Sequence, residues 1–294
     1  MKIYDCFMFF DEELILDLRL NILDEYVDKF IVTEATYSHS GNKKKLNFNI
    51  NNYPKFKDKI NYIVIDKNPY DLITLDNNKD NFSIKRQNSI KRIELSYNAM
   101  REAVSDANAE DIIILSDNDE IPNLNGVNFE NSKESIFIFK QKMFYYKFNL
   151  LYPSVPWFGS RACKRKNFVS PQWLRNTKQK KYPLWRFDII FSKKKYYNIF
   201  FVEDGGWHFT NVKSPKEIEK KLLNYTHHYE FEQSGLNLKD LKKKIEEKKI
   251  LYDHAMDQRK YKWGSEKKLT AISLNKMPDY LKENYKKYST WLEI

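Results

Sequence analysis

Residues 111–122 read Asp-Ile-Ile-Ile-Leu-Ser-Asp-Asn-Asp-Glu-Ile-Pro, and this stretch decides the fold class of the chain. The apolar run in residues 111–115 predicts a strand buried on both faces, because polar and apolar residues do not alternate in it. Asp117, Asp119 and Glu120 follow that strand directly. Ligands bind beyond the carboxyl ends of strands in open parallel sheets, so we expect these carboxylates at the ligand-binding edge of a sheet.

The residues before this stretch alternate between strand and helix signals. Short apolar runs predict three more strands, at residues 3–10, 30–33 and 62–65. Apolar residues that repeat every three or four positions predict two helices, at residues 14–22 and 84–107. Buried strands that alternate with helices indicate a mostly parallel sheet with helices on both faces.

The residues after this stretch carry more strand signals than helix signals. Strands are predicted at residues 136–139, 143–148, 187–191 and 196–202. Because helices are scarce here, we expect an antiparallel or mixed arrangement. Ser214, Pro215 and Glu217 are spaced as a capping box with proline at the first helical position, and they predict a helix start. A Lys-rich amphipathic helix is predicted over residues 236–252.

The acidic cluster and a later Gly-Gly-Trp-His segment are the candidate functional residues. Clustered acids repel one another unless a cation or hydrogen-bond donors offset their charge. A hard divalent cation at Asp117 and Asp119 could also hold the phosphate oxygens of a ligand. The paired glycines at 205–206 allow a sharp turn or a close approach to a ligand, and His208 can bind a metal. A solvated acidic turn and a core histidine are the alternative interpretations.

Composition limits the class of protein further. The chain has 294 residues, of which 41% are hydrophobic, so it can form a sizeable core. A net charge of +11 is typical of proteins that bind phosphorylated ligands, nucleic acid or anionic membranes, or of a solvated basic surface. Two cysteines make neither a disulfide framework nor a zinc site. Without a signal peptide or a long apolar run, we expect a cytoplasmic protein, peripheral at most to an anionic membrane surface.

Four segments in order along the chain resemble glycosyltransferase family 17, the family of the β-1,4-mannosyl-glycoprotein β-1,4-N-acetylglucosaminyltransferase. The segments are YDCF at residues 4–7, VDKFIVTE at 27–34, DIIILSDNDEIP at 111–122, and GWH at 206–208 with SP at 214–215 and KL at 221–222. The resemblance spans roughly residues 4–230. Because the chain shows no membrane anchor, it resembles a bacterial or viral member more than a Golgi enzyme.

The resemblance implies an α/β, GT-A-like single domain over residues 1–232. Its Rossmann-like nucleotide-binding half covers about 1–122, and a mixed-sheet acceptor half covers about 123–232. Residues 233–294 are expected to form a C-terminal helical extension. The implied reaction is an inverting, metal-dependent transfer of a sugar, with GlcNAc as one candidate, from a UDP-sugar to a glycan or glycolipid acceptor.

The resemblance also assigns roles to individual residues. Asp119 and His208 would bind Mn²⁺ or Mg²⁺, and Asp117 would assist the metal or contact the ribose of the donor. Glu34, at the end of the second strand, would lie near the nucleoside. Lys44 or its neighbour Lys45 would meet phosphate, with a solvated loop lysine as the alternative. The KP pair of the family is Lys44-Lys45 here, without the proline.

An inverting transfer needs a general base that deprotonates the acceptor hydroxyl. Asp204 is our preferred residue, because it lies shortly before the Gly-Trp-His segment, although no family motif matches it. Asp188 and Glu120 remain open as alternatives.

Two other functions compete with a glycosyltransferase. A metal-dependent phosphodiesterase would use clustered acids but would need more His and Asp ligands. A basic nucleic-acid-binding protein would explain the charge and the aromatic residues. The basic residues are spread along the chain without a nucleic-acid-binding motif, so we expect no nucleic-acid partner.

Overall fold

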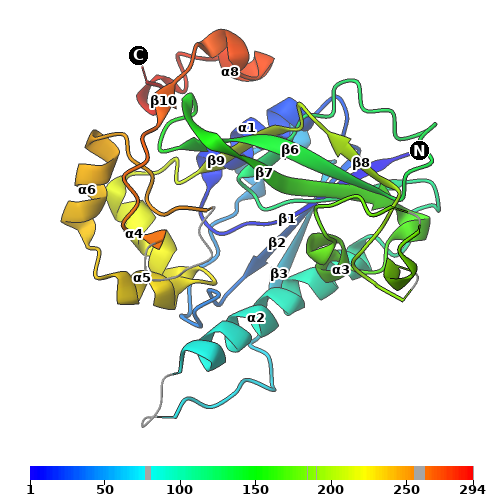
Figure 1. Cartoon of the computed structure of the whole chain (residues 1–294), viewed down its shortest axis with the longest axis horizontal. Helices are drawn as coiled ribbons and strands as arrows, with labels where there is room; N and C mark the ends of the chain where they lie inside the picture. The colour runs from blue at the N-terminus through cyan, green and yellow to red at the C-terminus, as the bar shows by residue number, and fades with distance from the viewer. Residues whose placement is uncertain (77–80, 184, 190, 255–261, 294) are drawn as a thin grey trace.

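The computed structural model describes residues 1–76, 81–183, 185–189, 191–254 and 262–293, and it is a mixed α/β fold around one large sheet (Figure 1). The main path of the sheet runs through β3 (Ile60–Ile65), β2 (Lys29–Ala35), β1 (Ile3–Met8), β4 (Ile112–Leu115), β7 (Leu150–Lys164), β6 (Ile136–Tyr145), β9 (Gly206–Thr210) and β5 (Glu120–Pro122). Two strands lie off this path: β8 (Ile199–Val202) pairs with β6, and β10 (Thr270–Ala271) pairs with β7.

The first half of the sheet is parallel, as the sequence predicts. β1 pairs in parallel with β2 and β4, and β2 pairs in parallel with β3. Side chains alternate between two cores: Ile112 and Ile114 pack on the side of α1 (Glu13–Leu23), whereas Ile113 and Leu115 pack on the side of α2 (Phe82–Ala103). Because both faces are covered, β4 is apolar and buried throughout.

The second half is mixed, and its central strand was not predicted. β7 runs antiparallel to both β4 and β6, and so joins the two halves. Pro153, Pro156 and Gly159 interrupt its sequence and hide its strand character. The strands predicted at 136–139 and 143–148 belong largely to the single strand β6, whose register against β7 shifts near Ile138 and Gln141.

The strand predicted at residues 187–191 is wrong. Phe187–Ile189 form a short 3₁₀ turn, and the ring of Phe187 is exposed to solvent. Phe187 and Phe191 face outward, so the apolar run does not mark a buried strand; Ile190 lies outside the described residues. A helix that the sequence analysis omitted, α3 (Pro171–Asn176), precedes this segment, and Ser170 caps it.

The helices after β9 follow the predicted start signal but are shorter than expected. α4 (Pro215–Asn224) begins with the predicted capping box, in which Ser214 and Glu217 bond to each other's backbone. α5 (His228–Ser234) follows, and α6 (Leu238–Glu246) occupies only part of the helix predicted at 236–252. The predicted boundary after residue 232 therefore falls inside α5.

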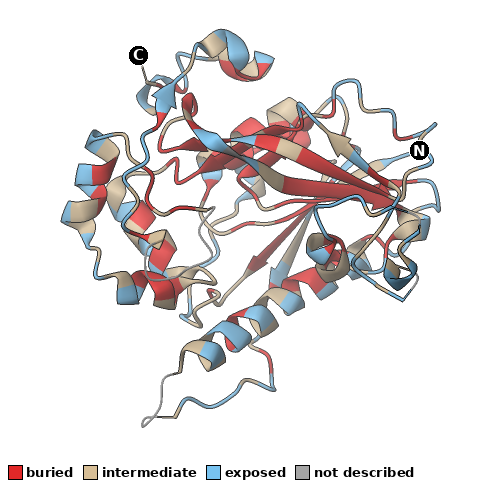
Figure 2. Ribbon diagram, viewed as in Figure 1, coloured by how far each residue is buried: buried red, intermediate tan, exposed pale blue. Residues whose placement is uncertain are grey.

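The C-terminal segment packs onto the rest of the fold. Leu241 and Ile250 share a core cluster with Met143 of β6 and Ile218 of α4. α8 (Asp279–Glu283) packs beside α1. Figure 2 shows buried residues continuing from the sheet into these helices. Short 3₁₀ helices lie at Ile50–Asn52, Pro54–Phe56, Arg165–Asn167, Leu274–Lys276 and Ser289–Trp291. Within the described residues, no helix has both the length and the apolar character needed to span a bilayer.

Candidate active site

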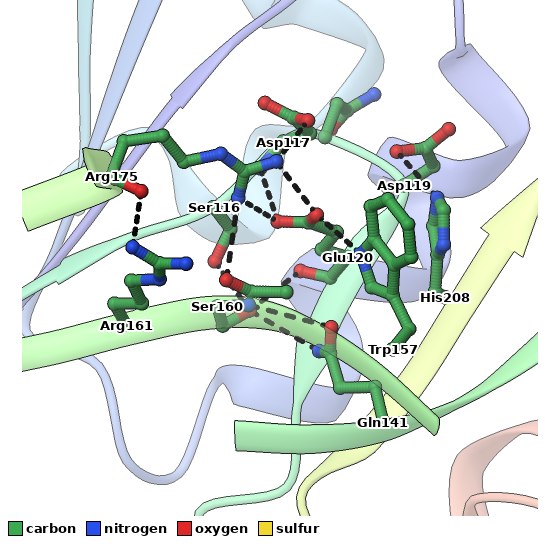
Figure 3. A network of polar contacts seen from close by, with 12 residues as sticks. Ser116, Asp117, Asp119, Glu120, Gln141, Trp157, Ser160, Arg161, Arg175 and His208 are labelled. Atoms are coloured by element: carbon green, nitrogen blue, oxygen red, sulfur yellow. Dashed lines mark hydrogen bonds and ion pairs between the residues drawn. The ribbon is translucent and has the colours of Figure 1, made fainter. Parts of the chain in front are cut away.

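The acidic segment forms a tight turn between β4 and β5. The backbone N–H of Glu120 donates to the carbonyl of Asp117 at 3.0 Å, and the N–H of Asp117 donates to the Glu120 carboxylate at 2.9 Å. This reciprocal bonding turns the Glu120 side chain inward, where it is fully buried. The side chains of Asp117 and Asp119 point instead into the cleft beyond the strand end (Figure 3).

Glu120 is the centre of a polar network that the sequence analysis did not predict (Figure 3). Both Arg175 Nη atoms donate to its carboxylate, at 2.8 and 2.9 Å, and Trp157 Nε1 donates to it at 2.7 Å. Arg175 Nη2 also donates to Asp117 Oδ2 at 2.7 Å. Arg175 lies in the last turn of α3, a helix signalled by Ser170 and the proline that follows it, as at Ser214.

Pairing of β5 with β9 brings Asp119 and His208 together. Glu120 lies opposite His208 in this antiparallel pair, and the N–H of Phe209 donates to the Asp119 carbonyl at 2.8 Å. His208 Nε2 lies 3.5 Å from Asp119 Oδ1. Gly206 adopts a φ of +109°, and a Cβ there would lie 2.2 Å from the Ile121 carbonyl. The glycine therefore permits the close approach of two strands that sets this geometry.

Two further groups fix the surroundings of this pair. The Trp157 ring stacks on the His208 imidazole at 4.7 Å with an interplanar angle of 28°. Lys221 of α4 donates from Nζ to Asp119 Oδ2 at 3.0 Å. Burial alone would raise the pKa of Asp119, but Lys221 and His208 outweigh it and hold that pKa far below its usual value. Asp119 is therefore ionised at neutral pH.

Asp117 has a different electrostatic environment, although it lies two residues away. Desolvation raises its pKa to about 6. The positive charge of Arg175 lowers this pKa, whereas the negative charges of Glu120 and Asp119 raise it further. Its side chain remains 46% exposed toward the cleft. Asp117 is thus the open carboxylate of the cluster, whereas Glu120 is its buried support.

The cluster lines a cleft of about 690 Å³, a size typical of small-molecule sites. The parallel half contributes Phe9, Phe10, Tyr37, His39, Arg92 and Tyr97, and the other half contributes Trp157, Arg175, Lys221, Tyr225, Tyr252 and His254. Four of the five histidines of the chain line this cleft, namely His39, His208, His227 and His254. Carboxylates, cations and aromatic rings therefore converge at one place, at the carboxyl end of the parallel strands.

Glu34 lies outside this cleft and is bonded entirely within the chain. Its carboxylate accepts hydrogen bonds from the backbone N–H groups of Asn47 and Phe48 at 2.8 and 3.0 Å, and from the Tyr62 hydroxyl at 2.9 Å. Lys44 completes the set with an ion pair. Lys44 does line the cleft, but in this structure its ammonium is held by Glu34.

The structure does not bring Asp204 to the cleft. Its side chain is 73% exposed, pairs with Lys142 at 2.9 Å and lines a separate hollow beside Asn123 and Phe200. The expectation that it lies near His208 fails because Asp204 lies in a bend before β9 begins at Gly206, and its side chain pairs there with Lys142. The alternative Asp188 lies on a surface segment, where it pairs with Arg186.

The donor atoms of the cleft limit how a metal could be held. Within the described residues, no group of three or more His, Cys, Asp or Glu side chains is arranged to hold a metal. Asp119 and His208 do provide one carboxylate and one imidazole side by side, and His208 Nδ1 is buried with no hydrogen-bond partner among the residues that the structure describes. Mg²⁺ is typically held by one or two carboxylates with substrate phosphates and water completing its shell. The pair fits a metal site that the substrate completes.

The fold and the cleft define the class: an α/β protein that binds a ligand at the carboxyl ends of its parallel strands. Comparison with known families then identifies the family. Residues 1–293 match the model of glycosyltransferase family 17, and the chain belongs to that family. The resemblance found in the sequence is confirmed, and the protein is a glycosyltransferase with a donor and an acceptor substrate. No curated protein matches the sequence.

Proposed function

We propose that this glycosyltransferase is metal-dependent and inverting, and that it has a GT-A-like arrangement. A nucleotide-binding half at about 1–122 would hold a UDP-sugar, and an acceptor half at about 123–232 would hold a glycan or glycolipid. GlcNAc is the first sugar to test, because the family resemblance includes an N-acetylglucosaminyltransferase. The parallel strands that end at the cleft support the assignment of the first half to the nucleotide.

One observation carries the proposal: Asp119 Oδ1 and His208 Nε2 lie 3.5 Å apart, and both residues line the cleft. They are 89 positions apart in the chain and are placed together by the β5–β9 pairing. We assign Mn²⁺ or Mg²⁺ to this pair, with Asp117 beside it in the cleft. When bound, the metal would offset the charge that develops on the leaving diphosphate.

The surrounding residues hold this pair in place. Lys221 keeps Asp119 ionised, and Trp157 stacks on His208 and so fixes the plane of the imidazole. Arg175 and Glu120 together anchor the turn that carries Asp117. Preorganised charges of this kind lower a barrier because they need not reorient during the reaction.

The general base must reach the acceptor hydroxyl inside the cleft. Asp204 lines a different hollow, so we transfer the base hypothesis to carboxylates that line the cleft. Besides Asp119, these are Glu12 and Asp117 among the described residues. Asp117 is the more open of the two and is our first choice.

Aromatic rings in the cleft support a sugar as the acceptor. Trp157, Tyr225 and Tyr252 line the side of the cleft formed by the second half of the chain. Apolar ring faces can pack against the CH faces of a sugar, while hydroxyl groups of the sugar meet the polar residues nearby.

The direct test is donor turnover by the purified protein with Mn²⁺ and a panel of UDP-sugars. We expect release of UDP, faster with an acceptor glycan, and no release after chelation of the metal. Asp119→Ala should lose this activity, whereas Asp106→Ala, an exposed control carboxylate, should keep it. Release of UMP instead would indicate a phosphodiesterase, and metal-independent release of UDP would contradict the proposed metal site.

A further inference from the structure

The segment between α3 and β8, residues 177–198, has a composition unlike the rest of the surface. It contains seven Lys or Arg residues and one acid, Asp188, which gives a formal charge of 7 − 1 = +6. It also contains six aromatic residues. Leu184 and Ile190 lie outside the described residues; we call the rest of this segment the basic-aromatic loop, and it lies beside α3 in Figure 1.

Three rings project from the tip of this loop into solvent. Trp185, Phe187 and Phe191 are 75%, 77% and 87% exposed. Large apolar side chains are rarely left this open together without a binding role. The rings are presented on consecutive tight turns, in which the N–H of Arg186 bonds to the Pro183 carbonyl at 3.1 Å.

The base of the loop is closed by its own hydrogen bonds. The N–H of Lys178 donates to the Lys194 carbonyl at 2.8 Å, and that of Tyr182 donates to the Tyr196 carbonyl at 3.2 Å. Trp173 of α3 also donates from Nε1 to the Lys193 carbonyl at 2.9 Å. These contacts hold the two arms of the loop together and attach them to α3.

Charge and apolar surface are separated along the loop. At the tip, Asp188 accepts two hydrogen bonds from Arg186, both at 2.8 Å, and one from Lys195 at 2.6 Å. Exposed lysines flank the tip on both arms, at positions 178, 180, 181, 193 and 194. Exposed rings at a tip whose carboxylate is offset by cations, between two cationic arms, match the depth profile of an anionic bilayer surface, where rings enter the interface and ammonium groups meet lipid phosphates.

We propose that the basic-aromatic loop is a docking surface for an anionic lipid membrane. An apolar anchor alone or a cationic patch alone binds membranes only marginally, whereas the two together give stable attachment. The loop supplies both. The proposal does not depend on the sugar or metal assigned to the cleft, because the loop lies outside the residues that line it.

The test is flotation of the purified protein with vesicles. Vesicles of equal parts phosphatidylcholine and phosphatidylglycerol should bind the protein, and pure phosphatidylcholine vesicles should bind it at least about tenfold more weakly. The variant Trp185→Ser/Phe187→Ser/Phe191→Ser should lose at least about tenfold in affinity for the anionic vesicles. Its matched control, Tyr70→Ser/Ile73→Ser/Leu75→Ser, changes three exposed apolar residues of another loop and should bind normally.

A second pair of variants tests the charge. Lys193→Glu/Lys194→Glu should weaken binding to anionic vesicles by about tenfold or more, whereas Lys242→Glu/Lys243→Glu on α6 should not. All variants should keep donor turnover in the absence of vesicles, which separates this test from that of the reaction. Failure of the parent protein to bind, or equal losses in the controls, would overturn the proposal. So would self-association through the three rings without vesicle binding.

Discussion

Glu34 and Asp119 are both carboxylates at the ends of buried parallel strands, but the structure surrounds them differently. The Glu34 oxygens meet four donors of the chain itself, two of them backbone N–H groups. The Asp119 oxygens meet side chains of Lys221 and His208 at the floor of a cleft. The same sequence pattern therefore has two outcomes: Glu34 closes a loop of the chain, whereas Asp119 lines an open cleft.

Glu34 and Asp119 differ in which hydrogen-bond donor a bound ligand would have to displace. Backbone N–H groups of Asn47 and Phe48 would lose their acceptor if Glu34 turned to a ligand, and an unpaired buried donor is costly. The ammonium of Lys221 is on a flexible side chain, so a metal or phosphate can share Asp119 with it at a smaller cost. The comparison predicts that Glu34 acts on stability and Asp119 on activity.

The largest effect is expected from Asp119→Ala. Transfer should fall by at least about a thousandfold, the rate equivalent of several kcal/mol of charge stabilisation. The melting temperature should stay close to that of the parent, because Lys221 keeps Glu12 as an ion-pair partner at 3.8 Å when the Asp119 carboxylate is lost. Transfer assays beside thermal melting measure both properties. Activity within about tenfold of the parent, with normal melting, would remove Asp119 from the metal site.

Glu34→Gln should show the reverse pattern. The substitution leaves Lys44 without its ion-pair partner and weakens the acceptor of two backbone groups, so the free energy of unfolding should fall by about 3 kcal/mol. Urea denaturation measures this change. Turnover of the folded fraction should fall far less than in Asp119→Ala. A normal unfolding curve combined with weaker UDP binding would instead support contact between Glu34 and the nucleoside.

His208→Ala tests the other half of the proposed metal site. The Mn²⁺ concentration that gives half-maximal turnover should rise by about tenfold or more, because one of two protein ligands is lost. An activity titration against Mn²⁺ measures it. A lower melting temperature with an unchanged titration would make His208 a structural histidine that packs under Trp157.

The smallest effect is expected from Asp204→Asn. Its pair with Lys142 is exposed and contributes little to stability, and it lies outside the cleft, so turnover should change by less than about threefold. Asp117→Asn is the matched cleft variant, and turnover there should fall by about a hundredfold or more if Asp117 is the base. A hundredfold loss in Asp204→Asn would restore the original hypothesis for that residue.

The parallel half of the fold and the start of α4 could be predicted because their signals are local. Apolar runs such as residues 111–115 are buried on both faces, and helix starts such as Ser214 are read from three or four neighbouring residues. β7 could not be predicted in this way. Its prolines and Gly159 hide the pattern, yet a Cβ at Gly159 would lie 2.9 Å from Glu120 Cδ, so the glycine makes room for the network.

The sequence by itself determined that a carboxylate cluster follows a buried strand, and its four segments pointed to the right family. Only the tertiary structure decided which residues share the site. Arg175 reaches Glu120 across 55 positions, whereas Asp204 lies in an exposed bend before β9 and pairs with Lys142 outside the cleft. Local patterns report on neighbours within about one helical turn, whereas contacts between distant residues depend on the packing of whole strands and helices.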